Sequence, residues 1–159
     1  MKVYQIGAAL ILLALCLCGC APRQVQAEFY AMDTVMQITA CGAGADDAVK
    51  AAEAEVYRLE GLLSCRNAEA ELARCNAGQV QVSTETAQLI EAALSISERT
   101  GGAYDPTLGA LTTVWGFSTG DHRVPDEAAR AQALMRCGTE KVAVRGSDVY
   151  LEDGVQLDL

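Results

Sequence analysis

Aromatic residues and histidine are scarce in this chain. Only 5% of its 159 residues are aromatic, and His122 is the single histidine. Few flat side chains leave few stacking partners for a planar ligand. One histidine gives little support for a Ser-His-Asp triad or a histidine-rich zinc site. His122 stands in the polar turn at residues 120–123, where we expect a solvated side chain rather than a catalytic one.

Positive charge is also in short supply. The chain has 12 Lys and Arg against 21 Asp and Glu, a formal net charge of −9. This balance argues against nucleic acid or a bare anionic membrane surface as a partner. The sequence has no Gly-x-Gly-x-x-Gly, no phosphate-loop lysine motif and no Gly-x-Ser-x-Gly, so the common nucleotide-binding and hydrolase signatures are absent. A phosphate-bearing ligand would need backbone amides or a metal ion.

Cysteines lack the Cys-x-x-Cys spacing of a zinc site. Four of them lie beyond residue 20, at Cys41, Cys65, Cys75 and Cys137. Outside the cytoplasm a disulfide between Cys65 and Cys75 can form. Isolated buried thiols fit the sequence at least as well, so both alternatives stay open.

The N-terminus has the features of an export signal. Lys2 precedes an apolar run at residues 6–17, which is too short to span a membrane. The junction Leu17-Cys18-Gly19-Cys20 resembles the lipobox of bacterial lipoproteins, with Cys20 as the acylated first residue of the mature chain. We expect a signal peptide at 1–19, a tether at 20–27, and a lipid anchor on the extracytoplasmic face of the cell membrane. The alternative is an ordinary signal peptide with an incidental cysteine.

The rest of the chain, residues 28–159, predicts an α+β domain with helices packed on a mainly antiparallel sheet. Period-two alternation predicts a strand at 28–41, interrupted at Asp33-Thr34. Apolar residues at helical spacing predict helices at 45–63, near 72–76, from the N-cap Ser83 to Gly101-Gly102, and at 126–137. The pattern also predicts strands at 141–144 and 149–152, which form a hairpin around residues 146–148.

The last five residues, Val-Gln-Leu-Asp-Leu, have the pattern of an apolar strand that carries one acid. Nothing that follows in the sequence caps or pairs this strand. Such an ending is typical of a piece of a longer protein. We therefore expect the domain to be truncated before its C-terminal half.

The segment 101–117 is dense in unusual residues. Gly101-Gly102 permits close backbone approach, and Pro106 fixes one backbone angle. Tyr104 offers an aromatic face with a polar tip, and Asp105 a carboxylate in a constrained turn. The purely structural alternative is a helix end that runs into an ordinary Asp-Pro turn, with residues 115–117 filling the core.

Five segments carry a family resemblance when they are taken in order. They are Met32-Asp33-Thr34, residues 63–76, Gly101-Gly102-Ala103-Tyr104-Asp105-Pro106-Thr107, Val114-Trp115-Gly116-Phe117, and residues 155–159. In this order the chain resembles the N-terminal half of the bacterial FAD:protein FMN transferases, the ApbE family of flavin transferases. The resemblance spans nearly all of the mature chain, and each segment alone is a weak signal.

The resemblance implies a reaction. FAD is split at its pyrophosphate, FMN is joined to a Thr or Ser hydroxyl of a flavin-accepting target protein, and AMP leaves with the help of Mg²⁺. The nucleophile belongs to the target, so no catalytic residue is assigned in this chain. The Mg²⁺ ligands are expected in the missing C-terminal half. We therefore predict that the chain as given neither binds Mg²⁺ tightly nor transfers FMN.

The resemblance also implies the contacts to FAD. The matching positions are Met32, Arg66, Ala103, Tyr104, Asp105 and Asp158. Asp105 and Asp158 would accept hydrogen bonds from the nucleotide, and Tyr104 would pack on a ring. Arg66 departs from the family, since many members have an aromatic residue there; a guanidinium can stack on a flat ring or meet a phosphate.

Two other classes of protein remain as alternatives. One is a non-catalytic lipoprotein of the cell envelope that binds a small ligand such as a flavin. The other is a structural envelope protein without a ligand, in which Asp105-Pro106 and Trp115 only build the core. Retained yellow colour or quenching of flavin fluorescence would separate the structural protein from the other two.

Overall fold

The computed structural model describes residues 23–159, which divide into two compact units that meet between Ala54 and Glu55. The predicted signal peptide, Cys20 and the first part of the predicted tether lie outside the described residues. Within residues 23–159, none of the helices has the length and apolar character needed to cross a membrane.

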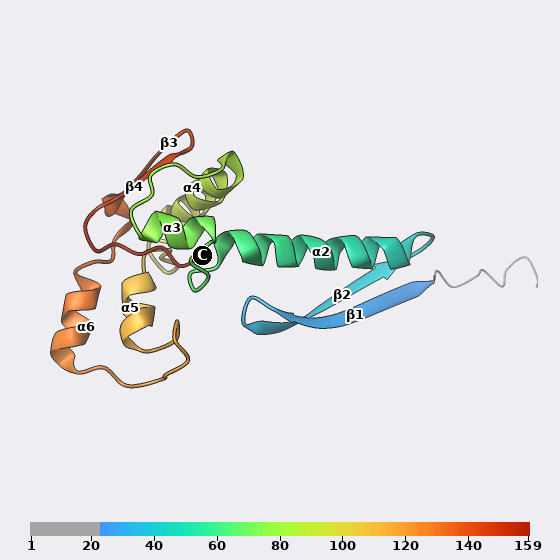
Figure 1. Ribbon diagram of the computed structural model, residues 1–159, viewed down its shortest axis with the longest axis horizontal. Coiled ribbons are helices and arrows are strands. Elements are labelled where there is room, and N and C mark those ends of the chain that lie inside the picture. Colours follow the sequence, from blue (N-terminus) through green and yellow to red (C-terminus); the bar gives the residue numbers. More distant parts are fainter. Residues whose placement is uncertain (1–22) are drawn as a thin grey trace, which may run out of the picture. The chain divides into compact units, whose positions relative to one another are not determined.

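A β-hairpin opens the first unit (Figure 1). Strands β1 (Gln24–Ala31) and β2 (Thr34–Cys41) pair antiparallel, with Phe29 opposite Met36. Met32 and Asp33 form the two-residue loop, and both have positive φ, 49° and 60°, as a type I′ turn requires. The prediction of one interrupted strand at 28–41 is therefore wrong, because the interruption is a turn. Residues 24–27, which the sequence placed in a tether, belong to β1.

Helix α2 (Ala45–Leu63) has the bounds that the sequence predicts. Asp46 lies in its first turn, where a negative charge favours the helix dipole. The Asp46 carboxylate also pairs with Arg23 before β1, with 2.8 Å between Nη2 and Oδ2. Both side chains are exposed, so this pair orients the two elements more than it stabilises them. The helix begins in the first unit and ends in the second.

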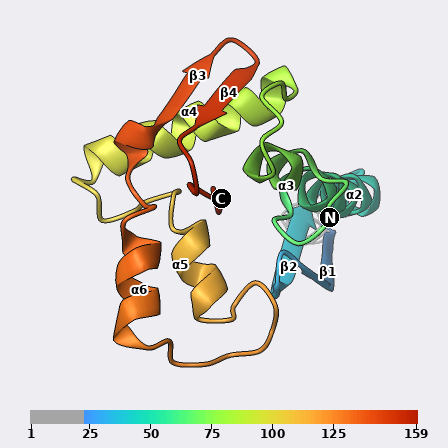
Figure 2. The ribbon, with the colours of Figure 1, turned by 60° about the vertical axis from the view of Figure 1, so that its left-hand side comes forward.

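The second unit holds the remaining elements (Figures 1 and 2). They are α3 (Glu71–Asn76), α4 (Thr84–Arg99), α5 (Gly109–Val114), α6 (Glu127–Leu134), the 3-10 turn η1 (Thr139–Lys141), β3 (Val142–Arg145) and β4 (Asp148–Leu151). The predicted α+β class with antiparallel strands is confirmed. In residues 23–159 the strands form two separate two-stranded sheets rather than one larger sheet.

Three elements of the second unit differ from the prediction. Helix α6 begins one residue later than predicted, because Asp126 is its N-cap and accepts a hydrogen bond from Ala129 N, and it ends at Leu134 rather than Cys137. Strands β3 and β4 each lie one residue nearer the turn than predicted, so the hairpin has a two-residue loop at Gly146-Ser147. Helix α5 was not predicted, because a six-residue helix between glycines leaves too short an apolar pattern.

The core of the second unit joins residues that are far apart in the sequence. Its buried members are Leu72, Cys75, Val82, Ala87, Ile90, Val149 and Leu157. Leu72, Ile90 and Leu157 have no exposed surface, and burying each such side chain contributes about 1.5–3 kcal/mol. The core therefore fixes the C-terminal segment (residues 155–159) against α3, α4 and β4.

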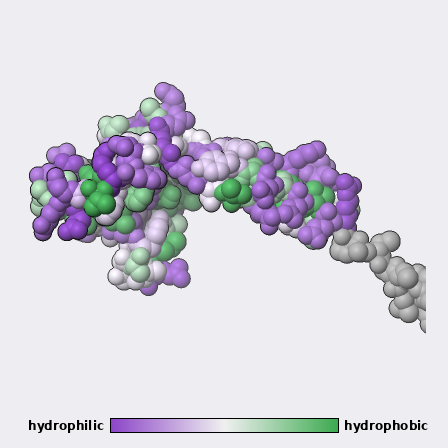
Figure 3. All heavy atoms as spheres, turned by 90° about the horizontal axis from the view of Figure 1, so that it is seen from below, coloured by the Kyte–Doolittle hydropathy of each residue, from purple (hydrophilic) through white to green (hydrophobic). Residues whose placement is uncertain are grey.

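Hydrophobic side chains also remain on the surface (Figure 3). Hydrophilic residues cover most of the face shown, and hydrophobic residues occupy smaller patches between them. The large exposed side chains include Tyr30 and Val35 in the first unit and Phe117 and Val124 in the second. Exposure of single apolar residues is normal for globular proteins, so these residues by themselves indicate no binding surface.

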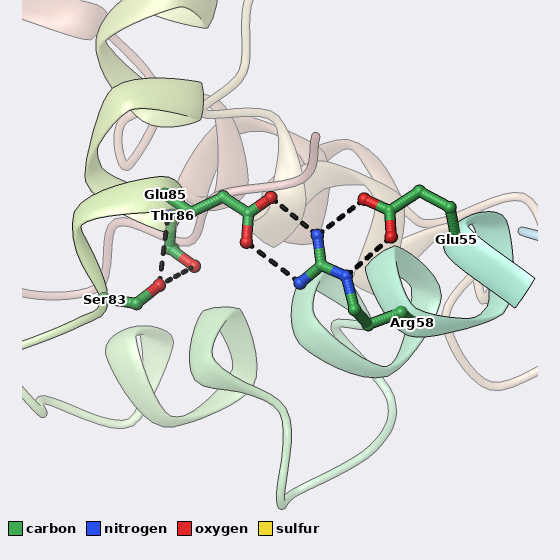
Figure 4. Close-up of polar contacts among 5 residues, drawn as sticks. All are labelled: Glu55, Arg58, Ser83, Glu85 and Thr86. Atoms are coloured by element: carbon green, nitrogen blue, oxygen red, sulfur yellow. Dashed lines mark hydrogen bonds and ion pairs between the residues drawn. The ribbon is translucent and has the colours of Figure 1, made fainter.

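Arg58 joins the end of α2 to the start of α4 (Figure 4). Its guanidinium contacts Glu55 at 2.8 Å and Glu85 at 2.6 Å, and both carboxylates are bound in fork geometry. The hydrogen bonds to Glu55 and then to Glu85 raise the pKa of Arg58 further. The three side chains are solvent-exposed, so their main effect is to set the angle between the helix ends.

The starts of α3 and α4 are tied together by a second polar contact. Ser83 is the N-cap of α4, and its Oγ accepts a hydrogen bond from Thr86 N at 3.2 Å. Its own backbone N donates to Glu71 Oε2 at 2.8 Å. Burial opposes the charge on Glu71, but hydrogen bonds from Thr86 and Ser83 outweigh it and lower the pKa of Glu71. Glu71 thereby joins the first turn of α3 to the start of α4.

Candidate functional site

The C-terminal segment (residues 155–159) is extended and lies between α3 and α5 (Figures 1 and 2). It is not a regular strand, but it is paired: Gln156 bridges Leu108 in parallel. Gly109 N donates to Gln156 O at 3.1 Å, and Asp158 N donates to Pro106 O at 2.8 Å. The prediction that nothing pairs this segment is wrong, because its partner is the turn that precedes α5.

Gly109 makes this pairing possible. A Cβ atom at this position would lie 2.7 Å from the carbonyl oxygen of Gln156. Real side chains do not approach a backbone oxygen so closely, so any larger residue would push the two segments apart. Glycine is required at this position because it lets the two backbone segments lie close together, and not because of an unusual backbone angle.

Asn76 completes the other edge of the C-terminal segment. Its Nδ2 donates to Leu157 O at 2.9 Å, and its Oδ1 accepts from Leu157 N at 2.7 Å. Cys65 Sγ also donates to Leu157 O, at 3.3 Å. Since Leu157 is fully buried, its backbone groups need partners inside the protein. One side-chain amide therefore takes the place of a neighbouring strand.

The carboxylate of Asp158 is held by two side chains from other elements. Thr112 Oγ1 in α5 donates to Oδ2 at 3.1 Å, and Cys65 Sγ lies 3.7 Å from Oδ1. Burial raises the pKa of the Cys65 thiol to about 12, and the charge and hydrogen bond of Asp158 add to the shift. Cys65 is therefore a neutral thiol at physiological pH, able to donate and unreactive as a nucleophile.

Asp105 is held by its own turn. Its Oδ1 accepts from Thr107 N at 2.8 Å and from Thr107 Oγ1 at 2.6 Å, an Asx-turn arrangement. Thr107 is fully buried, and its Oγ1 in turn accepts from Gly138 N at 2.7 Å. The turn is thus anchored to the chain that follows α6, and within residues 23–159 Thr107 binds Oδ1 of Asp105 rather than Oδ2.

The charges of both carboxylates act on the phenol of Tyr104. Partial burial raises the pKa of the Tyr104 phenol, and the negative charges of Asp158 and then Asp105 raise it further. The geometry agrees: Asp158 N donates to Pro106 O at 2.8 Å, which places Asp158 beside the turn that carries Tyr104 and Asp105. Tyr104 is 37% exposed, so a ligand can reach its ring. The structure therefore brings three of the predicted contact residues into one place.

The other predicted contacts are placed as follows. Ala103 is exposed and directly precedes Tyr104, in the turn that Gly101 and Gly102 open with positive φ. Arg66 is exposed and directly follows Cys65, and its backbone N donates to Ser64 Oγ at 3.2 Å. Met32 is 41% exposed in the hairpin turn of the first unit. For all three, contact with FAD stays a prediction.

Four residues that build this site had no predicted role in it: Cys65, Asn76, Thr107 and Thr112. Thr107 has a local signal, because a hydroxyl two residues after Asp is the pattern of an Asx turn. The other three have none. Their partners lie 46 to 93 positions away in the sequence, and no local pattern predicts such pairs.

The described residues do not fit a magnesium site. Within residues 23–159, no group of three or more His, Cys, Asp or Glu side chains could hold a metal ion. A Mg²⁺ ion in a phosphoryl-transfer site takes oxygen ligands from carboxylates in addition to the substrate phosphates, and these residues offer no such set. The four described cysteines, Cys41, Cys65, Cys75 and Cys137, are all free thiols, so the alternative of a bridge between Cys65 and Cys75 is not adopted.

A small aromatic group follows α5. Trp115 and Phe117 are nearly parallel with ring centroids 6.4 Å apart, and His122 meets Phe117 edge-on at 5.4 Å. Phe117 is 54% exposed, so the alternative in which residues 115–117 simply fill the core is wrong for this ring. His122 is exposed, as the sequence predicts.

Comparison with known proteins gives consistent matches. The model of the ApbE family matches residues 32–159. A protein from Treponema pallidum (strain Nichols) named FAD:protein FMN transferase is 35% identical over 127 residues, which cover 70% of this chain and 35% of that protein.

Two solved structures share the fold. The ApbE protein of Thermotoga maritima superposes with a TM-score of 0.81 at 27% identity, covering 86% of this chain and 47% of that one. The apo flavinyl transferase ApbE of Pseudomonas stutzeri has a TM-score of 0.74 at 22% identity, covering 88% and 48%. The chain thus spans between about a third and a half of the length of these relatives.

Proposed function

The chain belongs to the ApbE family, and from this premise we propose that it is the flavin-nucleotide-binding part of an FAD:protein FMN transferase. The observation that supports this most is the hydrogen bond from Asp158 N to Pro106 O, which brings Asp158 beside the turn of Tyr104 and Asp105. All three are positions at which the family resemblance implies contact with FAD. The relative from Treponema pallidum carries the name of this activity.

The proposed reaction moves an FMN group. The bond between the FMN phosphorus and the bridging pyrophosphate oxygen breaks, and a new bond forms from that phosphorus to a Thr or Ser hydroxyl oxygen of a target protein. AMP leaves, and the hydroxyl proton is released. Phosphoryl transfers of this kind depend mainly on positioning. The dependence on Mg²⁺ belongs to the proposal through the family resemblance alone.

In this proposal each residue of the site binds or orients the nucleotide. Thr107 occupies Oδ1 of Asp105, so Oδ2 is the atom that we assign to an N–H or O–H group of FAD. Thr112 and Cys65 fix the carboxylate of Asp158, which would accept a second hydrogen bond. Tyr104 would pack against a ring, worth about 1 kcal/mol where its face is desolvated.

A titration of the purified chain with FAD, followed by flavin fluorescence, tests this assignment. The wild-type chain should quench the fluorescence in a saturable manner. Asp105→Asn and Asp158→Asn should each weaken binding about tenfold or more, because each loses a hydrogen bond to a charged acceptor. Asp153→Asn, an exposed carboxylate outside the site, is the matched control and should leave the affinity unchanged. Equal affinity in all four proteins would contradict the assignment.

A second assay addresses transfer itself. The chain is incubated with FAD, Mg²⁺ and a flavin-accepting domain, and covalent flavin on that domain is measured by in-gel fluorescence. We expect none, because the described residues provide no ligand set for Mg²⁺. Covalent flavin that appears with this chain alone would contradict the expectation that the Mg²⁺ ligands lie outside it.

We also propose that Cys20 is acylated and anchors the protein to the extracytoplasmic face of the cell membrane. The support is the lipobox-like junction before Cys20. Expression in a bacterial host should give a protein that partitions into detergent and carries acyl chains on its first residue. Cys20→Ala should release it into the aqueous phase, and an unchanged partition would contradict the proposal.

A further inference from the structure

Thr112 contacts the carboxylate of Asp158 from the middle of α5. Its Oγ1 lies 3.1 Å from Asp158 Oδ2 and 3.0 Å from the carbonyl oxygen of Gly109, one turn back in the same helix. An ionised carboxylate only accepts hydrogen bonds, so Thr112 is the donor in this contact. The single hydroxyl proton is shared between two acceptors.

The backbone of Asp158 is held by the same region. Its N–H donates to Pro106 O, while Gly109 N donates to Gln156 O. Gly109 therefore joins α5 to the C-terminal segment and also accepts from Thr112. The second side chain at the carboxylate is Cys65, whose thiol is a weak donor at the longer distance of 3.7 Å. Among the described residues, Thr112 makes the stronger contact that fixes the rotation of this carboxylate.

We propose that Thr112 is the positioning residue for Asp158, fixing its carboxylate in the orientation that meets a flavin nucleotide bound beside Tyr104. This inference rests on the proposed function for the identity of the ligand. The rival explanation is that Thr112 only bonds back to Gly109 O within its helix, in which case the contact with Asp158 is incidental.

A set of four variants separates these explanations through FAD affinity. Thr112→Val keeps the shape of the side chain and removes the hydroxyl, and it should weaken FAD binding about fivefold. Thr112→Ser keeps the hydroxyl and should restore affinity to within about twofold of wild type. In an Asp158→Asn background, Thr112→Val should have little further effect, because its action passes through Asp158. Additive losses, or Thr112→Ser as weak as Thr112→Val, would overturn the proposal.

A second readout does not depend on FAD. The phenol of Tyr104 titrates near the charge of Asp158 and that of Asp105, so its pKa, followed by NMR of labelled tyrosine, reports where the Asp158 charge lies. Asp158→Asn should lower the pKa of Tyr104, and Thr112→Val should move it from the wild-type value because the Asp158 charge changes position. Thr112→Ser and Thr113→Val, an exposed neighbour in α5, should leave it at the wild-type value.

The two measurements test separately the positioning role of Thr112 and the proposed binding of FAD. If Thr112→Val does not move the Tyr104 titration, Thr112 does not position Asp158, whatever the affinity for FAD. If the Tyr104 titration moves as expected but the wild-type chain does not bind FAD, the positioning stands and the proposed function of the site is contradicted.

Discussion

The carboxylates of Asp105 and Asp158 lie at one site but are held in different ways. Asp105 is bound by Thr107, two positions later in the same turn. Asp158 is bound by Thr112 and Cys65, which are 46 and 93 positions away. One half of the site is therefore set by local chain geometry and the other by the tertiary structure. Changes that loosen the packing of the second unit should displace Asp158 before Asp105.

The largest effect is expected from Gly109→Ala. The new Cβ would lie 2.7 Å from Gln156 O, so the C-terminal segment must move away from α5. We expect the free energy of unfolding in urea to fall by about 2–3 kcal/mol. Gly61→Ala in α2, where a Cβ meets nothing within 4 Å, is the control and should be neutral or stabilising by about 0.5–1 kcal/mol. Equal stability of both variants would contradict the close approach.

Asn76→Ala should have the next largest effect. It leaves the buried N–H and C=O of Leu157 without the amide that pairs with both, at a cost of about 2 kcal/mol in the free energy of unfolding. Asn67→Ala removes an exposed side chain that accepts only from Glu69 N and should cost about 0.5 kcal/mol. Equal losses of unfolding free energy in urea for the two substitutions would contradict the role of Asn76 in pairing with Leu157.

Thr107→Val acts on the local half of the site. It removes the hydroxyl that donates to Asp105 and accepts from Gly138 N, with an expected loss of about 1–1.5 kcal/mol in thermal or urea unfolding. Because Asp158 does not depend on this turn's hydroxyl, its contact with Thr112 should persist. In NMR, the chemical shift of the Asp105 carboxyl carbon should change, and that of the Asp158 carboxyl carbon should change little. The reverse pattern would contradict the division into local and tertiary halves.

The smallest effect at neutral pH concerns Cys65. Its pKa is raised from 9.0 to about 12 by burial and by Asp158, so the folded state favours the neutral thiol. This stability is fully present below about pH 9 and is lost as the pH rises toward 12. Cys65→Ser, which does not ionise in this range, should show a smaller loss of stability between these pH values. An identical alkaline profile in the two proteins would argue against a shifted thiol.

The same thiol can be probed chemically. At pH 8, iodoacetamide should label the exposed Cys41 much faster than Cys65, because the thiolate is the reactive form. Peptide mass spectrometry identifies the labelled residue. Comparable rates at the two positions would contradict the burial and the raised pKa of Cys65.

The features that could be predicted from the sequence are those with local causes. Helix α2 has its predicted bounds because its apolar spacing is continuous over 19 residues. Ser83 acts as the predicted N-cap, and Gly101 and Gly102 adopt the positive φ predicted for a helix stop. Tyr104 and Asp105 stood out because Gly, Tyr, Asp and Pro together restrict a turn in a recognisable way.

The features that could not be predicted depend on distant partners or on a choice between similar patterns. The alternation at 28–41 predicted one strand interrupted at Asp33-Thr34, and only the pairing of β1 with β2 shows that the interruption is a turn. The C-terminal segment looked unpaired because Asn76 and Pro106, which bind it, carry no signal of that role. Side-chain-to-backbone pairing across 81 positions has no local signature.

The central claim is that Tyr104, Asp105 and Asp158 form one flavin-nucleotide site in this chain. The most direct measurement is a titration of the isotopically labelled chain with FAD, followed by NMR resonances of assigned residues. The account predicts that Tyr104, Asp105 and Asp158 shift together with a single dissociation constant, while exposed positions such as Asp153 remain unchanged. No shifts at these three residues, or shifts that saturate at different FAD concentrations, would contradict it.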